Sequence, residues 1–141
     1  MLNKSEIKRW FRSGSFRFML DSRFTAYTPK RGIYIWRKKP IYYRPGTSDT
    51  EVIYKILLRS GKKAEYYIPS TIVPNTILDI GGNIGIASIY FANLFPDAQI
   101  FTFEPVPNNI AILSDNIAPY PNIRAFPIAL GNNDGHFEMF S

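Results

Sequence analysis

The 141-residue sequence contains no cysteine and a single histidine. Without thiols the chain cannot form a disulfide framework, and with one imidazole it cannot assemble a metal site from nitrogen and sulfur ligands. We therefore expect neither a disulfide nor a bound metal. The N-terminus also lacks the apolar run of a signal peptide, so a cytoplasmic protein is the default expectation.

Basic residues are scarce in the second half of the chain. Residues 71–141 contain only Arg124 against six acids, a net charge of −5, whereas residues 1–70 contain 16 of the 17 Lys and Arg against five acids, a net of +11. The basic half is also aromatic, and the alternation from Gly32 to Arg37 predicts short hairpin strands. We expect a small α+β region over residues 1–70 and an α/β core over residues 71–141.

A short basic and amphipathic segment opens the chain. Its basic side chains are Lys4, Lys8, Arg9 and Arg12, and its apolar ones are Ile7, Trp10 and Phe11. This composition is typical of a segment that touches an anionic membrane surface, and it is too weakly apolar to span one. A purely structural alternative is a solvated face with its aromatics packed on the core. A further option is that the basic residues bind an acidic or phosphorylated sugar substrate. Nucleic acid is disfavoured because the basic residues are scattered and no recognition motif accompanies them.

Residues 48–51, Ser-Asp-Thr-Glu, have the spacing of a capping box. They predict a helix from Asp49 to about Ser60 that serves as a scaffold. The side chains expected to face the core are Val52, Ile53, Ile56 and Leu57. Pro69 to Pro74 then forms a connection into the second region.

Residues 77–85 read I-L-D-I-G-G-N-I-G, an apolar strand with one acid, Asp79, that opens on glycines into a helix over residues 86–95. Glycines let a backbone turn sharply beside a ligand. A dinucleotide site prefers G-x-G-x-x-G, but here Gly81 and Gly85 sit four apart with no third glycine on that register. The pattern suits S-adenosylmethionine better, because the acid can answer its ammonium, directly or through water, and turn amides its carboxylate.

Residues 99–103 form the next expected strand, and Glu104 lies at its carboxyl end, where ligands of open α/β sheets bind. The acid follows Gly85 by 19 residues. A carboxylate at this place can accept hydrogen bonds from both ribose hydroxyls. Pro105 and Pro107 stiffen the turn and start a helix, whose apolar stripe is Ile110, Leu113 and Ile117.

Taken together, these motifs resemble the FkbM family of class I S-adenosylmethionine-dependent methyltransferases. The resemblance covers about two thirds of the chain, from near Tyr42 to the end, and the motifs in combination are far more specific than any one alone. The segments that carry it are Leu78 to Gly85, Phe103 to Asn109, Leu113 to Ile117 and Ile128 to Gly135, with Arg44 to Asp49 upstream.

The resemblance implies a set of residues that bind S-adenosylmethionine. The residues implied to line its methionine and ribose part are Asp79, Gly81, Gly82, Asn83 and Gly85. Glu104 would hold the ribose hydroxyls, Pro105 would shape the adenine side, and Ala129, just after a third strand near residues 123–128, would lie near the adenine edge. Family members act on sugars and natural products, which implies a small-molecule or glycan acceptor, methylated on a hydroxyl oxygen. The sequence assigns no catalytic base.

Each of these residues also has a structural explanation. The glycines could serve close packing, Asp79 could cap backbone amides, and Asn83 could simply tolerate a left-handed turn. Glu104 could be a solvated turn residue. His136 follows a hairpin turn over residues 132–135 that leads into a strand expected over residues 137–140, and a solvated strand residue is favoured there over a catalytic base.

A complete class I methyltransferase sheet has more strands than the roughly three or four expected after Thr76. The family pattern continues with a fourth core strand and an acidic D-x-E-G segment, and neither occurs here. The strand of Asp79 would therefore be an unpaired edge that needs a C-terminal continuation or a partner chain to cover it. Two competing functions are a non-catalytic S-adenosylmethionine-binding module and, against the glycine register, an NAD-dependent oxidoreductase.

Overall fold

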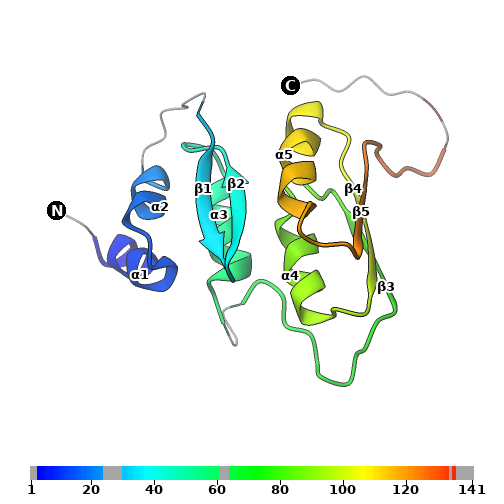
Figure 1. Ribbon diagram of the computed structural model, residues 1–141, viewed down its shortest axis with the longest axis horizontal. Coiled ribbons are helices and arrows are strands. Elements are labelled where there is room, and N and C mark those ends of the chain that lie inside the picture. The colour runs from blue at the N-terminus through cyan, green and yellow to red at the C-terminus, as the bar shows by residue number, and fades with distance from the viewer. Residues whose placement is uncertain (1–2, 24–29, 61–63, 134, 136–141) are drawn as a thin grey trace.

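The computed structural model describes residues 3–23, 30–60, 64–133 and 135. The fold is α/β, with an antiparallel two-stranded sheet in the first part of the chain and a parallel three-stranded sheet in the second (Figure 1). The elements are, in order, α1 (Lys4–Ser13), α2 (Phe16–Asp21), β1 (Gly32–Trp36), β2 (Lys39–Tyr43), α3 (Asp49–Leu57), β3 (Thr76–Ile80), α4 (Ile86–Leu94), β4 (Gln99–Phe103), α5 (Pro107–Ile117) and β5 (Ile123–Phe126).

The hairpin expected in the N-terminal region is confirmed. Strands β1 and β2 pair antiparallel from Gly32 opposite Tyr43 to Trp36 opposite Lys39. The two turn residues, Arg37 and Lys38, have φ of 49° and 65°, the positive values that a tight two-residue hairpin turn requires. The twist of the hairpin thus imposes a left-handed backbone on two residues that do not favour it.

Helix α3 begins at Asp49 as the sequence predicts, but the prediction of a capping box at its start is wrong. Ser48 has helical dihedral angles, φ −65° and ψ −12°, and its side chain makes no capping hydrogen bond. Glu51, the other half of the expected box, pairs instead with Arg9 of α1. The helix ends at Leu57 rather than near Ser60, and of its expected core residues Ile53 and Ile56 are buried, while Val52 and Leu57 are half-buried against the same cluster.

The parallel sheet has the order β3-β4-β5, with β3 at an edge as expected. Asp79 pairs with Thr102 and Ile80 with Phe103, so β3 and β4 end side by side at their carboxyl ends. Helices α4 and α5 connect the strands and cover the same face of the sheet (Figure 1). This βαβαβ unit has the arrangement of half a Rossmann-like fold, and its third strand ends at Phe126, slightly earlier than predicted.

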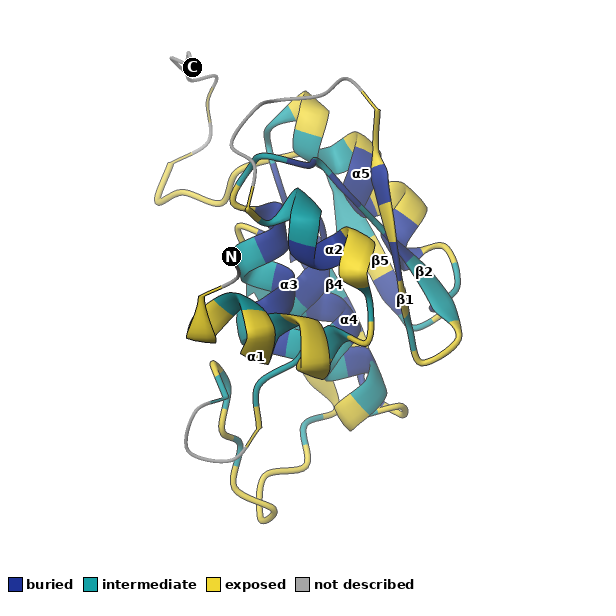
Figure 2. Ribbon diagram, turned by 90° about the vertical axis from the view of Figure 1, so that its left-hand side faces the viewer, coloured by how far each residue is buried: buried dark blue, intermediate teal, exposed yellow. Residues whose placement is uncertain are grey.

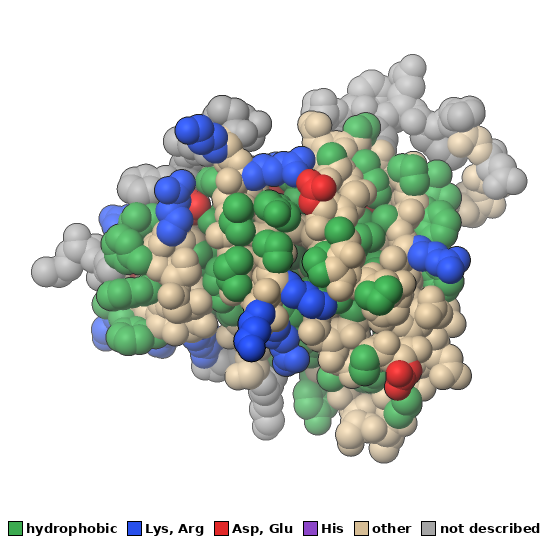
Figure 3. Space-filling model, in the orientation of Figure 1, with side chains coloured by type: hydrophobic (Ala, Val, Ile, Leu, Met, Phe, Trp, Pro, Cys, Tyr) green, Lys and Arg blue, Asp and Glu red, His purple; other side chains and the backbone are tan. Residues whose placement is uncertain are grey.

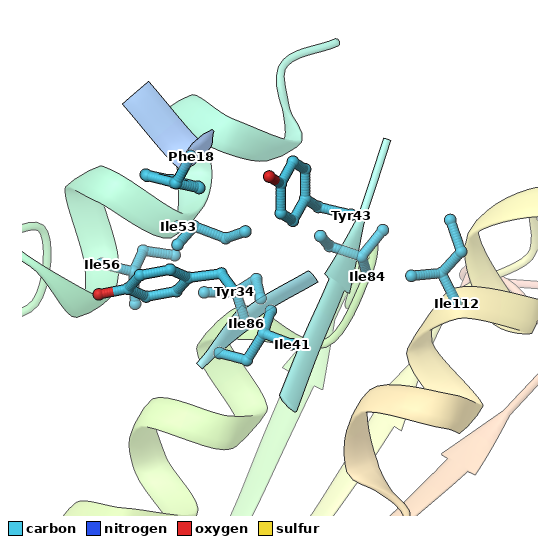
Figure 4. Packing of buried hydrophobic residues seen from close by; sticks show 9 residues of the cluster. All are labelled: Phe18, Tyr34, Ile41, Tyr43, Ile53, Ile56, Ile84, Ile86 and Ile112. Atoms are coloured by element: carbon cyan, nitrogen blue, oxygen red, sulfur yellow. The ribbon is translucent and has the colours of Figure 1, made fainter. Parts of the chain in front are cut away.

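The N-terminal region and the parallel-sheet unit share one hydrophobic core. Side chains of the hairpin, α2 and α3 pack with residues from the start of α4 and from α5 (Figure 4), and buried positions concentrate where these elements meet (Figure 2). The buried members of this cluster are Phe18, Tyr34, Ile41, Tyr43, Ile53, Ile56, Ile84, Ile86 and Ile112. A second cluster fills the space between α4, α5 and the sheet.

The face of the sheet opposite α4 and α5 carries apolar side chains. Leu78 and Ile80 of the edge strand are 59% and 64% exposed. Their neighbours across the strands are Phe101 and Phe103, and Phe103 stacks on Phe126 with ring centroids 5.2 Å apart. Within the part of the chain that the structure describes, this apolar face is open to solvent.

Candidate cofactor site

A glycine turn joins the carboxyl end of β3 to α4. Gly81 and Gly85 have φ of 83° and 87°, and Asn83, between them, has φ of 48°. A Cβ on Gly82 would lie 2.0 Å from Oγ1 of Thr102, so at this position only glycine lets the turn approach β4. A Cβ on Gly81 would meet nothing within 4 Å. Gly82 is therefore required by packing, whereas Gly81 presents bare backbone to open space.

The backbone amides of the turn bond to the chain itself. Those of Gly81 and Gly82 both donate to the carbonyl of Phe103, at 2.9 and 3.0 Å, and that of Gly85 donates to the carbonyl of Gly82 at 2.7 Å. The amide of Asn83 donates to Oε2 of Glu104 at 2.8 Å. Each of these bonds holds the turn in place. The sequence predicts that amides of this turn bind a ligand carboxylate, but these four amides already have acceptors within the chain.

Glu104 lies next to the turn and is only 5% exposed. Besides the Asn83 amide it accepts hydrogen bonds on Oε1 from the Val106 amide at 2.9 Å and from Nδ2 of Asn109 at 3.2 Å. These donors are uncharged, and no described cation forms an ion pair with it. An ionised carboxylate has about four acceptor positions, so a negative charge and one position remain for a ligand.

Asp79 points to the α4 side of the sheet. Its Oδ2 accepts hydrogen bonds from the Ser88 hydroxyl at 2.6 Å and from the Thr102 hydroxyl at 3.4 Å. Burial, together with the charges of Asp79 and Glu65, raises the pKa of Tyr66. Through its bond with Ser88, the Asp79 carboxylate links β3 to α4.

The remaining expected residues lie farther along the chain. Pro105 is half-buried between Glu104 and the start of α5, whose first residue is Pro107 as expected. Ala129 lies in the exposed segment after β5. His136 and the strand expected over residues 137–140 fall outside the described residues. The structure thus brings the glycine turn and Glu104 together. Asp79 lies in β3 just before the turn, and its side chain is bonded to Ser88 of α4.

Sequence reasoning missed Asn116, a fully buried residue of α5. Its Nδ2 donates to the carbonyls of Ile84 at 2.8 Å and Tyr42 at 3.0 Å, and its Oδ1 accepts from the Tyr42 amide at 2.7 Å. One side chain thus connects the glycine turn to the hairpin. The available signal was a polar residue directly before Ile117, within the apolar stripe of an amphipathic helix.

A separate hollow of about 380 Å³ lies at the other end of the molecule, between residues 68–74 and 94–98. Its lining is mostly apolar and includes no residue of the glycine turn. Among the described residues there is no cluster of three acids or histidines placed to bind a metal. None of the described helices has the length and apolar character needed to cross a bilayer.

The parallel βαβαβ order, the glycine turn after its first strand and the acid after its second define a partial Rossmann-like unit. No protein-family model matches the chain. Over 63 residues it is 39% identical to the 2-O-methyltransferase NoeI of Sinorhizobium fredii, which covers 45% of this chain and 26% of that protein. Over 77 residues it is 34% identical to the methyltransferase sdnD of Sordaria araneosa, covering 55% and 29%.

The chain is therefore similar to methyltransferases, and it spans less than a third of the length of these two relatives. Over 89 residues it is also 33% identical to the AMB antimetabolite synthetase AmbE of Pseudomonas aeruginosa, which covers 60% of this chain and 4% of that protein. Two solved structures, transferase PH0793 and TYW2 in complex with MeSAdo, both from Pyrococcus horikoshii, align with a TM-score of 0.46 and 14% identity over 72% of this chain and 37% of each of theirs.

Proposed function

We propose that the chain is the cofactor-binding part of an S-adenosylmethionine-dependent methyltransferase of the FkbM kind. The observation that carries the proposal is the hydrogen bond between Glu104 and the Asn83 amide, which joins the acid after β4 to the glycine turn after β3. The similarity to NoeI and sdnD supports the same reaction class.

The residues around the turn fit a nucleoside with a charged tail. Gly81 leaves open space beside the backbone, and Glu104 keeps one acceptor position for a ribose hydroxyl. A second position becomes available when the Asn109 amide leaves Oε1, and at 3.2 Å this is the longest of the three bonds to Glu104. Cofactor binding is therefore expected to exchange the Asn109 contact for a ribose hydroxyl.

When bound, S-adenosylmethionine supplies an electrophilic methyl group, and the protein has to align it with the acceptor. The turn and Glu104 would hold the cofactor at the ends of two rigid strands, which fixes its position. We infer a hydroxyl acceptor, because the name of NoeI specifies 2-O-methyl transfer. The resemblance to the FkbM family implies that this hydroxyl belongs to a sugar or natural product. A hydroxyl needs a base that removes its proton, and none of the residues above is assigned that role.

Calorimetric titration of the 141-residue chain with S-adenosylhomocysteine tests the proposal, with NADH in parallel. We expect saturable binding of S-adenosylhomocysteine alone. Glu104→Gln should weaken it by about tenfold or more, because a charged acceptor of two hydroxyls is lost. The matched control is Asn109→Ala, which frees Oε1 and should leave affinity equal or improved. Binding of NADH, or equal affinity of the Glu104→Gln variant, would contradict the proposal.

A further inference from the structure

Helix α1 is well formed although none of its residues is buried. At its start Asn3 and Glu6 form a reciprocal capping box, with the Asn3 side chain accepting from the amides of Ser5 and Glu6 at 3.0 Å. At its end Gly14, with φ of 64°, caps the last turn by donating to the Trp10 carbonyl. The helix is thus held by its caps and not by an apolar face packed on the core.

The side of α1 that faces the protein is polar. Arg9 pairs with Glu51 and lies 4.6 Å over the ring of Tyr54. Glu6 pairs with Arg23 at 3.3 Å and has only 17% of its side chain exposed. An ordinary surface helix turns its charged residues outward and its apolar ones toward the core. In α1 this arrangement is reversed.

The outward side carries an aromatic patch made of Ile7, Trp10 and Phe11 of α1 with Phe16 of α2. Phe11 is 78% exposed and Phe16 50%. Trp10 stacks on Phe11 with ring centroids 5.7 Å apart and meets Phe16 edge-on at 5.6 Å. Figure 2 shows α1 exposed along most of its length, and hydrophobic side chains gather over this end of the molecule in Figure 3.

Basic side chains border the aromatic patch. At 100° per residue, Lys4 and Lys8 lie on the flank of the helix next to Phe11, and both are exposed. Arg12 follows them on this flank, with its guanidinium bonded to the Tyr54 hydroxyl at 3.3 Å. Residues 1–70, to which α1 belongs, carry 16 of the 17 basic residues of the chain. A partner that fits this surface must therefore offer an apolar layer beneath negative charge.

We propose that α1 and Phe16 dock the protein onto the surface of an anionic phospholipid bilayer, a property beyond the methyl transfer proposed above. The aromatic patch enters the headgroup layer, where Trp and Phe rings are stabilised, and the basic flank contacts lipid phosphates. With ten residues α1 lies along the interface and does not cross it. Single-stranded nucleic acid fits less well, because no nucleic-acid recognition motif accompanies the basic residues.

Co-sedimentation of the full chain with vesicles tests the proposal, using phosphatidylcholine alone and phosphatidylcholine mixed with phosphatidylglycerol. We expect partition onto the anionic vesicles only, reduced at high salt. Phe11→Ser should lower it by about tenfold, since one exposed ring no longer enters the lipid. The matched control is Tyr67→Ser, because Tyr67 is 76% exposed and lies in the segment between α3 and β3.

Charge is tested by Lys4→Glu/Lys8→Glu, which should lower partition by more than about tenfold. The double variant Lys38→Glu/Arg124→Glu makes the same change in net charge away from α1 and should have a much smaller effect.

Insertion of the aromatic patch can be followed by tryptophan fluorescence. The chain has two tryptophans, so Trp36→Phe leaves Trp10 as the only source of tryptophan emission. Its emission should shift to the blue when anionic vesicles are added.

Several results would overturn the proposal. They are absence of partition, equal partition onto phosphatidylcholine alone, or unchanged partition of Phe11→Ser when circular dichroism shows a native fold. Binding to an RNA homopolymer that displaces the vesicles would assign the surface to nucleic acid instead, and dimerisation lost in Phe11→Ser would assign it to a second copy. Binding of S-adenosylhomocysteine, measured on the same variants, should be unchanged and keeps the two proposals separate.

Discussion

The N-terminal region and the parallel-sheet unit each bury a carboxylate, and they hold it by different means. Asp49 is fully buried and accepts three bonds from one residue, from the amide, Nε and Nη2 of Arg44, at 2.8 to 2.9 Å. Glu104 is almost as buried but accepts only from uncharged amides. The first carboxylate is paired with a guanidinium of the chain itself, whereas the second is held only by the dipoles of uncharged amides.

The same contrast extends to the ion pairs. In each described ion pair the cation belongs to residues 1–70, and the only one that reaches the parallel-sheet unit joins Arg31 to Asp115 at the surface. Asp79 relies on hydroxyl donors and Glu104 on amides. The basic region thus stabilises itself with charge, while Asp79 and Glu104, the two acids beside the glycine turn, form no ion pair among the described residues.

The largest effect expected from this contrast is on stability. Asp49→Ala removes the three hydrogen bonds that the buried carboxylate accepts from Arg44 and should lower the free energy of unfolding by about 3 kcal/mol. Glu104→Gln keeps one acceptor oxygen but turns an NH2 group toward a backbone N–H that then has no acceptor, so it should cost about 1 to 2 kcal/mol. Urea unfolding of both variants measures the difference. Equal losses would break the distinction between a structural and a ligand-binding carboxylate.

Asp49 also shows what the sequence could and could not predict. Its helix was predictable because helix starts depend on the local spacing of residue types. The capping box failed because Ser48 has helical dihedral angles and makes no capping bond, while Glu51 pairs with Arg9, 42 residues upstream. Which hydrogen-bond partner each of these side chains finds depends on the folded structure, and the spacing of residue types in the sequence does not predict it.

The site shows the same division between local and distant contacts. The glycine turn and the strands around it were predictable, because a glycine requirement and apolar runs are properties of adjacent residues. The role of Asn116 was not, since its partners Ile84 and Tyr42 are 32 and 74 residues away in the chain. A side chain that joins two regions becomes recognisable only when both have been placed.

Asn116 provides the second prediction, because it joins the two regions compared above. Asn116→Ala removes three hydrogen bonds and leaves buried backbone groups of Tyr42 and Ile84 without this partner, so it should cost about 3 kcal/mol. The control is Asn93→Ala, whose amide bonds only to the Ile89 carbonyl within α4 and should cost about 1 kcal/mol or less. Urea unfolding followed by circular dichroism checks both. A loss no larger than that of the control would mean that the regions hold together without Asn116.

Within the glycine turn, stability and ligand binding should separate. Gly82→Ala forces a Cβ to 2.0 Å from the Thr102 hydroxyl, an overpacking that should cost about 2 kcal/mol. Gly81→Ala meets nothing within 4 Å and should cost about 1 kcal/mol for its left-handed backbone, while weakening S-adenosylhomocysteine binding. Thermal unfolding and calorimetry on both variants test this. Partial rescue of Gly82→Ala by Thr102→Ala would show that the clash is the cause.

The smallest expected effect concerns alkaline pH and the tyrosines of residues 1–70. Burial, and then the hydrogen bond to Asp21, raises the pKa of Tyr43 well above its usual value of 10.0, and burial raises that of Tyr34. Above pH 10 the unfolded chain loses these protons while the folded chain keeps them, so the free energy of unfolding should fall as pH rises, by up to about 1.4 kcal/mol per pH unit for each group.

Tyr43→Phe removes one of these groups and tests the assignment. The variant loses the 2.6 Å bond to Asp21 and should be less stable at pH 7 by about 1 kcal/mol. Its stability should then fall less steeply between pH 10 and 11 than that of the natural sequence, whereas the exposed control Tyr67→Phe should leave the slope unchanged. Urea unfolding at a series of pH values gives both slopes. An unchanged slope in Tyr43→Phe would mean that the alkaline loss of stability does not originate in the Tyr43 hydroxyl.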